Sequence, residues 1–493
     1  MTFTYDFPMP VSTILFIVNL ACSLTIIFLE RKTPQSSWAW LLFVWVIPVI
    51  GFLFYLYLSQ NLTKRKIYRY NTPEIEEYKR VLGSQKKAIV DRQHTTKNEM
   101  LLRRHKNLID YHINVGQSLY TDNNRVTMYF DGHDKFNALF EAIENAKDSI
   151  HLEYYIVKND DLGQRFMDLL TKKAHEGVQV RLLVDEMGGR YIRNKRINAF
   201  KKAGGNFGIF FPSRIPLPIN IRINYRDHRK IAVIDGKIGF VGGYNVGNEY
   251  LGLKRKMGYW RDTHLKIEGY AVYELQMRFF LDWRTSGNHV RKHPDKETMS
   301  RYFPDMDNTF SGSGVQIVSS GPDNANQIIK QGFIRMITNA ERYILIQSPY
   351  FVTDESIMEA LKIALLSGVE VRIMIPNKPD HVFIYWATLS YVGELIGYGA
   401  KVYIYDNGFL HAKVVVVDDQ ISAVGSCNFD IRSFSLNFET NAFVYDPDVA
   451  ITLRQQFMKD IKKSIDYNQE RYNNRSRIQQ IKESVSRLFS PVL

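Results

Sequence analysis

The chain contains the stretch His228-Arg-Lys-Ile-Ala-Val-Ile-Asp235 and, further along, the matching stretch His411-Ala-Lys-Val-Val-Val-Val-Asp418. In both stretches, the apolar run after the lysine predicts a β-strand with two buried faces. Side chains two residues apart on a strand point to the same face, so each histidine projects together with its own lysine. A pattern of this length that occurs twice predicts a duplicated fold.

The sequence around the two stretches repeats as well. Each copy reads as a helix, an apolar strand, a second helix, a second apolar strand and a strand pair. The matching segments are 145–153 with 339–347, 177–184 with 368–375, and 262–267 with 439–444. We therefore expect two similar α/β domains, each a mixed sheet flanked by helices, at residues 125–300 and 301–470.

Small and amide residues follow each stretch at the same spacing, as Gly242-Gly243-Tyr-Asn245 and as Gly425-Ser426-Cys-Asn428. Asp235 and Asp418 are typical of tight turns, which would return these residues to the side of the histidine and lysine. The same two carboxylates could instead support the lysine or histidine directly. The amides of Asn245 and Asn428 would supply neutral hydrogen-bond donors.

Two histidines and two lysines in one site suit phosphodiester chemistry. One imidazole attacks phosphorus, the other protonates the leaving oxygen, and the ammonium groups stabilise the charge that develops. Lysine is not a metal ligand and no carboxylate cluster accompanies these histidines, so we expect no metal and no other cofactor. The predicted catalytic residues are His228, Lys230, Asp235, His411, Lys413 and Asp418.

The paired H-x-K-x4-D pattern resembles the signature of the phospholipase D superfamily. The resemblance implies that the two domains share one active site and that a covalent phosphohistidine forms, with His228 as nucleophile and His411 as general acid. It also implies a supporting acid at Glu439, with Asp262 at the aligned position of the first half. Gly243 departs from the family, which usually has a serine there, so the phosphate contact of that hydroxyl is in doubt; Ser426 keeps it in the second half.

Segments at both ends of the chain resemble the bacterial cardiolipin synthases: Arg31-Lys-Thr-Pro34, Trp38-Ala-Trp40, Asn428-Phe-Asp-Ile-Arg-Ser433 and Arg487-Leu-Phe-Ser-Pro491. That resemblance implies transfer of a phosphatidyl group from one phosphatidylglycerol to another, with release of glycerol. A phospholipase D-type hydrolase would differ only in using water to resolve the intermediate. A nuclease of the same superfamily is a third alternative, and an apolar N-terminus argues against it.

Two apolar runs, 11–29 and 38–58, precede the predicted domains, and the second contains no charged residue. At about 1.5 Å per residue, each helix would reach roughly 30 Å, which is the thickness of the bilayer hydrocarbon core. A cleaved signal peptide is disfavoured because the first run has no basic flank and a second run follows at once. We expect a transmembrane helical hairpin within residues 1–60.

Basic residues predominate, with 64 Lys and Arg against 51 Asp and Glu and a formal net charge of +13. We predict that residues 61–124 form a basic juxtamembrane linker. Positive flanks stay on the cytoplasmic side, so the catalytic domains should face the cytoplasm at the cell membrane. The expected partners are phosphatidylglycerol and other anionic lipids, not nucleic acid. Residues 471–493 form a basic amphipathic tail, either on the membrane surface or packed on the body.

Overall fold

The computed structural model describes residues 11–29, 34–47, 50–58, 99–212, 225–286, 301–306, 312–378 and 380–490. The chain divides into two compact units. In its described part, the smaller unit consists of the helices α1 (Val11–Leu29), α2 (Pro34–Val46) and α3 (Ile50–Leu58). Across all of the described ranges, no helix combines the length and hydropathy required to cross a membrane.

The predicted second span, 38–58, is not one helix. Helix α3 turns back onto α2, and the rings of Trp40 and Tyr55 lie 5.4 Å apart. In a continuous helix these residues would be separated by roughly 22 Å along the axis. The sequence has Pro48 between the two helices, and proline cannot donate the hydrogen bond that a continuous helix requires. Gly51 permits the close approach, because a Cβ there would lie 2.9 Å from the carbonyl oxygen of Phe43.

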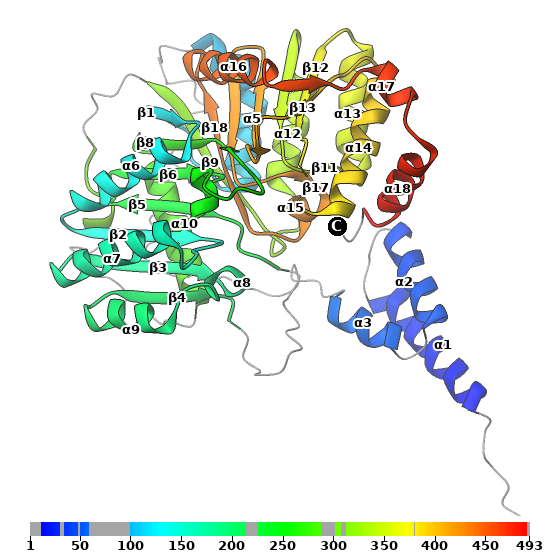
Figure 1. Cartoon of the computed structure of the whole chain (residues 1–493), viewed down its shortest axis with the longest axis horizontal. Helices are drawn as coiled ribbons and strands as arrows, with labels where there is room; N and C mark the ends of the chain where they lie inside the picture. Colours follow the sequence, from blue (N-terminus) through cyan, green and yellow to red (C-terminus); the bar gives the residue numbers. More distant parts are fainter. Residues whose placement is uncertain are drawn as a thin grey trace, which may run out of the picture. The chain divides into compact units, whose positions relative to one another are not determined.

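The larger unit is built on one fifteen-stranded mixed sheet (Figure 1). In spatial order, its first half contains β4 (Asn206–Phe210), β3 (Gln179–Asp185), β2 (Ser149–Tyr154), β5 (Lys230–Ile234), β6 (Ile238–Gly242), β8 (His264–Gly269) and β1 (Thr121–Tyr129). The second half continues with β9 (Ser313–Ser320), β18 (Glu439–Tyr445), β16 (Ile421–Gly425), β15 (Val414–Val417), β10 (Tyr343–Gln347), β12 (Glu370–Pro376), β13 (Lys401–Tyr405) and β19 (Ser464–Asp466).

The two halves have the same topology and meet where β1 pairs antiparallel with β9. In each half, three parallel strands (β2, β3 and β4, or β10, β12 and β13) join a set of antiparallel strands. Strand β6 contacts both β16 and β18, so the sheet folds over and its halves pack face to face. Two similar α/β halves with a mixed sheet are therefore confirmed.

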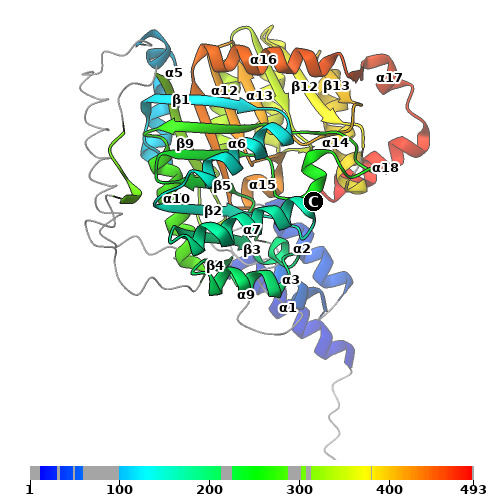
Figure 2. The ribbon, with the colours of Figure 1, turned by 60° about the vertical axis from the view of Figure 1, so that its left-hand side comes forward.

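Helices cover both faces of each half, as Figure 2 shows. The first half has α6 (Gly132–Glu144), α7 (Asp161–His175), α9 (Asn194–Lys202) and α10 (Val272–Thr285), and the second has α12 (Ile328–Thr338), α13 (Glu355–Leu366), α14 (Val382–Ile396) and α16 (Pro447–Ile461). Along β5, Ile231 and Val233 belong to a core shared by both halves, whereas Ala232 and Ile234 belong to the core of the first half. Strand β5, whose side chains are apolar on both faces, is thus buried on both faces, as predicted.

The predicted linker at 61–124 is only partly a linker. Residues 61–98 lie outside the described ranges, and helix α5 (Glu99–Tyr111) follows them. Leu108 and Ile109 of α5 are buried in the core of the second half. Residues 99–111 therefore belong to the folded body, because their apolar side chains complete a core formed by residues more than 200 positions away.

Two buried arginines of the first half reach into the second. The Arg229 guanidinium donates to the Asp282 carboxylate over 3.0 Å and, across the interface, to the Thr440 hydroxyl over 3.1 Å. The Arg261 guanidinium donates to the carboxylate of Asp460 over 2.9 Å, and both side chains are 2% exposed. A buried charge that loses its partner keeps the full cost of its desolvation, so these arginines hold the halves together.

We predict that Arg261→Met destabilises the body by about 3–5 kcal/mol, because it leaves the Asp460 carboxylate buried without its cation. The matched control is Arg125→Met, which removes an ion pair to Glu268 from an arginine that is 56% exposed. That change should cost less than about 1 kcal/mol. Thermal unfolding of the detergent-solubilised proteins measures both, and equal losses would contradict the assignment.

Candidate active site

Backbone hydrogen bonds hold each of the two histidines against the opposite half of the molecule. His228 lies two residues before β5, and its N–H donates to the carbonyl of Phe438 over 2.9 Å. His411 lies three residues before β15, and its N–H donates to the carbonyl of Arg261 over 2.7 Å. The residues after Phe438 and Arg261 are Glu439 and Asp262. Each histidine is therefore held next to an acid of the other half.

The side chains of each histidine and of the acid from the other half are also in contact. The imidazole Nδ1 of His228 lies 2.9 Å from Oε1 of Glu439, and that of His411 lies 2.6 Å from Oδ2 of Asp262. A carboxylate at Nδ1 fixes the ring and leaves Nε2 as the reactive nitrogen. Both acids were predicted as supporting residues, but the sequence did not show that each would support the histidine of the opposite half. The histidine side chains remain 11% and 10% exposed, so a substrate can reach them.

The two lysines belong to the same site. Lys230 and Lys413 each donate a hydrogen bond to the carbonyl oxygen of the preceding histidine, over 2.5 Å. Burial, together with the neighbouring Lys413 charge, lowers the pKa of Lys230 to about 7 against the opposing effect of Glu439. Burial likewise lowers the pKa of Lys413 to about 8. Two desolvated ammonium groups with depressed pKa values form a site that an anion would stabilise.

The two imidazoles are neutral at pH 7. Burial lowers the pKa of His228 to about 4, although Glu439 opposes the shift. Burial and the neighbouring Lys413 charge also lower the pKa of His411. The carboxylates stay ionised, because His228 and Lys230 lower the pKa of Glu439 even though burial alone would raise it, and the pKa of Asp262 is lowered in the same way.

The departure at Gly243 has a steric cause. In the second half, the Ser426 hydroxyl donates to Oε2 of Glu439 over 2.5 Å. In the first half, a Cβ at Gly243 would lie only 2.1 Å from Oδ1 of Asp262. The shorter acid therefore occupies the space of a serine side chain, and it accepts the backbone N–H of Thr263 over 2.7 Å instead.

The predicted asparagines differ in their surroundings. Asn245 was predicted as a phosphate-binding or supporting residue, and its amide is used within the protein. Its Oδ1 accepts the N–H of Ile156 and its Nδ2 donates to the Tyr250 hydroxyl. These two bonds show Asn245 in the supporting role. Asn428 is 4% exposed, and its Oδ1 has no hydrogen-bond partner among the residues that the structure describes.

Asp235 and Asp418 hold turns away from the histidines, which is the first of the two alternatives that the sequence left open for them. Each lies seven residues beyond its histidine, roughly 23 Å along the strand at about 3.3 Å per residue. Each carboxylate accepts three backbone N–H groups, from Lys147, Asp148 and Ser149 for Asp235 and from Glu341, Arg342 and Tyr343 for Asp418. The two aspartates tie the turn after β5 and β15 to the loop before β2 and β10.

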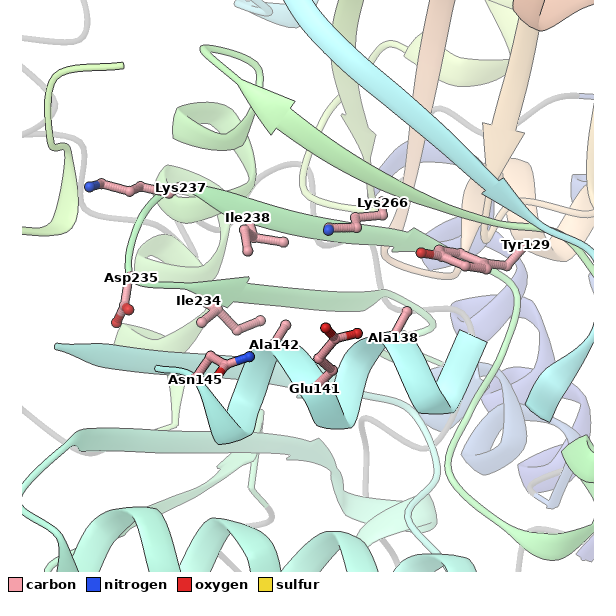
Figure 3. Close-up of a pocket in the computed structure, with 10 residues that line it drawn as sticks. All are labelled: Tyr129, Ala138, Glu141, Ala142, Asn145, Ile234, Asp235, Lys237, Ile238 and Lys266. Carbon is pink, nitrogen blue, oxygen red and sulfur yellow. The ribbon is translucent and has the colours of Figure 1, made fainter. Parts of the chain in front are cut away.

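A surface hollow at the Asp235 end of β5 is shown in Figure 3. Its lining residues are Tyr129, Ala138, Glu141, Ala142, Asn145, Ile234, Asp235, Lys237, Ile238 and Lys266. Because it lies at the end of the strand remote from His228, it is separate from the catalytic constellation.

Aromatic side chains beside the histidines were missed by the sequence analysis. The ring of Tyr155 lies 5.3 Å from that of His228, and the ring of Trp260 lies 5.1 Å from that of His411, between centroids. Tyr155 follows the end of β2, where the strands of the parallel set present residues to the site. Its position directly after an apolar strand was the available signal.

Comparisons with known proteins agree with this geometry. The family model described as cardiolipin synthase, PLD-like domain, matches residues 139–268 and 333–461, and the one described as phospholipase D-nuclease N-terminal matches residues 17–60. The major cardiolipin synthase ClsA of Bacillus subtilis (strain 168) is 48% identical over 489 residues, which are 98% of this chain and 100% of that protein. The chain belongs to the cardiolipin synthase family.

Another member of the cardiolipin synthase family, from Oceanobacillus iheyensis, is 48% identical over 97% of this chain and 98% of its own length. Among solved structures, the phosphatidylserine synthase of Haemophilus influenzae Rd KW20 superposes with a TM-score of 0.59 at 15% identity. The match covers 78% of this chain and 98% of that one. At this identity, the likeness concerns the fold alone.

We predict that the site takes up a proton when it binds an oxyanion. At pH 8, Lys230 with its pKa of about 7 is mostly neutral, and a bound anion should restore its charge. Titration calorimetry with sulfate, in buffers of different ionisation enthalpy, should show uptake of about one proton per sulfate. Sulfate suits this test because it does not titrate near pH 8.

The matched control for proton uptake is Lys230→Arg, because arginine is already charged at pH 8. This variant should bind sulfate with clearly less proton uptake than the unaltered protein. Equal uptake by the two proteins would show that the proton goes elsewhere.

Proposed function

We propose that the protein condenses two phosphatidylglycerol molecules into cardiolipin and glycerol through a covalent phosphatidyl-histidine. The observation that carries the proposal is the pair of crossed histidine–acid contacts around two buried lysines. Relatives that match nearly the whole chain are named cardiolipin synthases. Hydrolysis of membrane lipids is the second candidate and nucleic-acid cleavage the third, and the relatives favour neither.

In the first half-reaction, Nε2 of His228 attacks the phosphorus of the donor lipid. A P–N bond forms while the P–O bond to glycerol breaks, and His411 gives its proton to the leaving oxygen. The phosphodiester anion between the lysines would raise the pKa of His411 and so favour the protonated form. Glu439 stabilises the positive charge that develops on the His228 ring.

In the second half-reaction, neutral His411 accepts the proton of the incoming hydroxyl group. The alcohol oxygen attacks phosphorus, the P–N bond breaks, and His228 is regenerated. Water in the same place would give phosphatidic acid. The relatives named cardiolipin synthases support transfer to an alcohol.

The choice of His228 as nucleophile follows the superfamily pattern for the first half, and one asymmetry accompanies it. Both carboxylate oxygens of Glu439 lie within 3.1 Å of His228 Nδ1, and Ser426 holds one of them. His411 contacts a single oxygen of the shorter Asp262. The geometry alone is compatible with either assignment.

We also propose that the smaller unit is embedded in the cell membrane as a multi-pass element, with the catalytic body in the cytoplasm. Helices α1, α2 and α3 contain no charged residue. Their exposed side chains are apolar, with Phe28 of α1 76% exposed and Leu53 of α3 59% exposed. The N-terminal family match at residues 17–60 supports the same placement, as does the basic segment that follows.

We expect equal amounts of cardiolipin and free glycerol when purified protein is incubated with phosphatidylglycerol vesicles. The activity should persist in excess chelator, because Lys230 and Lys413 neutralise the phosphate. Lipid chromatography and an enzymatic glycerol assay measure the products, with a His228→Ala/His411→Ala double variant as the blank. Phosphatidic acid as the main product would favour the hydrolase instead.

Removing only the general acid should leave the first half-reaction possible for a good leaving group. His411→Ala, given a phosphatidyl nitrophenyl diester, should release a burst of nitrophenol and retain a phosphatidyl adduct on His228. His228→Ala should do neither. Mass spectrometry locates the adduct, and its detection on His411 in the His228→Ala protein would reverse the two roles without changing the mechanism.

A further inference from the structure

Helix α18 (Arg477–Leu488) near the C-terminus packs on the body through its polar side. The side chains of this stripe recur at helical spacing and are partly or fully buried: Gln479, Glu483, Ser486, Arg487 and, just past the helix, Ser490. Arg487 forms an ion pair with Glu394 of α14 at 2.5 Å. Gln479 donates to Glu483 over 2.9 Å, and Arg475 pairs with the same carboxylate. These contacts determine which side of α18 faces the protein.

The apolar side of α18 consequently faces outward. Ile478 is 67% exposed, Ile481 62% and Leu488 79%, with Val485 and Phe489 also exposed. These positions recur every three or four residues, which in a globular protein marks the side turned to the core. An apolar stripe of this kind on the outside of the fold is typical of a docking surface.

The start of α14 extends this surface. Val382 and Phe383 are 60% and 56% exposed, and the rings of Phe383 and Phe489 are in contact, with centroids 6.2 Å apart. Figure 1 shows α18 lying alongside α14. The α18 patch is defined as Ile478, Ile481, Val485, Leu488, Phe489, Val382 and Phe383.

The start of α14 lies on the side of the second half that carries the site residues. Asp380, two residues before α14, is close enough to Lys413 to raise its pKa against the lowering effect of burial. The Asp380 carboxylate also accepts a hydrogen bond from the Tyr350 hydroxyl, which lies within electrostatic range of Tyr155 beside His228. An acyl chain that leaves a phosphate held at the lysines would therefore meet apolar side chains at the start of α14.

Charge decides which partner fits. Residues 469–490 contain five Lys and Arg against two Glu. Lys482 and Arg477 are exposed on the helix that bears the apolar stripe, and Lys482 also lies over the ring of Trp386. Exposed apolar side chains flanked by cations are the pattern of a helix that lies in the interface of an anionic bilayer.

We propose that the α18 patch inserts into the surface of an anionic phospholipid bilayer and seats the catalytic site against it. The polar side of α18 is anchored in the protein and its apolar side lies in the lipid. The patch would let a lipid pass from the bilayer to the catalytic lysines without exposure of its chains to water. All residues of this docking surface belong to the larger unit.

The test uses the full-length protein with one introduced cysteine, at Ile481→Cys or Leu488→Cys, that carries a polarity-sensitive fluorophore. The two native cysteines, Cys22 and Cys427, are buried, so the label goes to the new site. The control is Leu366→Cys, at a position 73% exposed at the end of α13. Leu366 lies on α13 and is not part of the α18 patch.

In phosphatidylglycerol proteoliposomes, we expect blue-shifted emission at positions 481 and 488 and quenching by lipids with a nitroxide on the acyl chain. The Leu366→Cys label should keep solvent-like emission. The quenching should weaken when phosphatidylcholine replaces phosphatidylglycerol or when salt is raised, since the flanking cations contribute. Solvent-like emission at 481 and 488 would overturn the proposal. Blue-shifted emission without lipid quenching would also overturn it, by showing that another protein surface covers the patch.

A second measurement links the patch to substrate access. Ile481→Gln/Leu488→Gln should lower turnover on vesicles about fivefold, because it removes two inserted side chains. Turnover of a monomeric short-chain phosphatidylglycerol should be unchanged, which would show that the variant is folded and active. Equal losses on both substrates would contradict a role in docking. The fluorescence result requires no catalysis, so it stands even if the proposed reaction is wrong.

Discussion

The exchange of acids between the two halves is the constraint on which the rest of the structure depends. His228 is oriented by Glu439 and His411 by Asp262, so neither half can form a working site alone. A histidine nucleophile must hold its reactive nitrogen within a fraction of an ångström of the attacking position. The halves must therefore be locked in register. Paired backbone bonds beside each histidine and the buried arginines at the interface provide that lock.

The electrostatics of the site follow from the same closure. Packing the halves face to face buries Lys230 and Lys413 near each other, and burial lowers the pKa of both. Two positive charges that are buried close together are costly in free energy. A phosphodiester anion lowers that cost by pairing with both ammonium groups. The same two buried lysines therefore bind the substrate phosphate and are already in place to stabilise the charge of the transition state. A lipid substrate must still leave the bilayer, and the outward apolar side of α18 would meet that requirement.

The two halves share a topology, but they are not equivalent. Ser426, which contacts Glu439, corresponds to Gly243, which lies against Asp262. The different lengths of the two acids account for the replacement of serine by glycine. Oδ1 of Asn428 has no hydrogen-bond partner among the described residues, whereas Oδ1 and Nδ2 of Asn245 each have one. Differences of this size around a shared phosphate could allow one half to hold the nucleophile and the other to seat the acceptor.

Much of this molecule was determined by the sequence itself. The duplication, the mixed sheet and the projection of each histidine with its lysine all follow from patterns only a few residues long, because the alternation of side chains along a strand is a local property. Local chemistry also restricted the reaction to phosphodiester transfer, because two His-Lys pairs in one site suit few other reactions.

Only the tertiary structure decided which groups meet. Glu439 is 211 positions from His228, and no local rule connects them. Asp235 looked catalytic from its spacing, yet the strand carries it roughly 23 Å away, where three backbone N–H groups bind it. The periodicity of α18 predicted an amphipathic helix, but which side faces the protein depended on partners such as Glu394 in α14. Periodicity shows that a helix has two sides, and only the packing of the whole chain decides which side is buried.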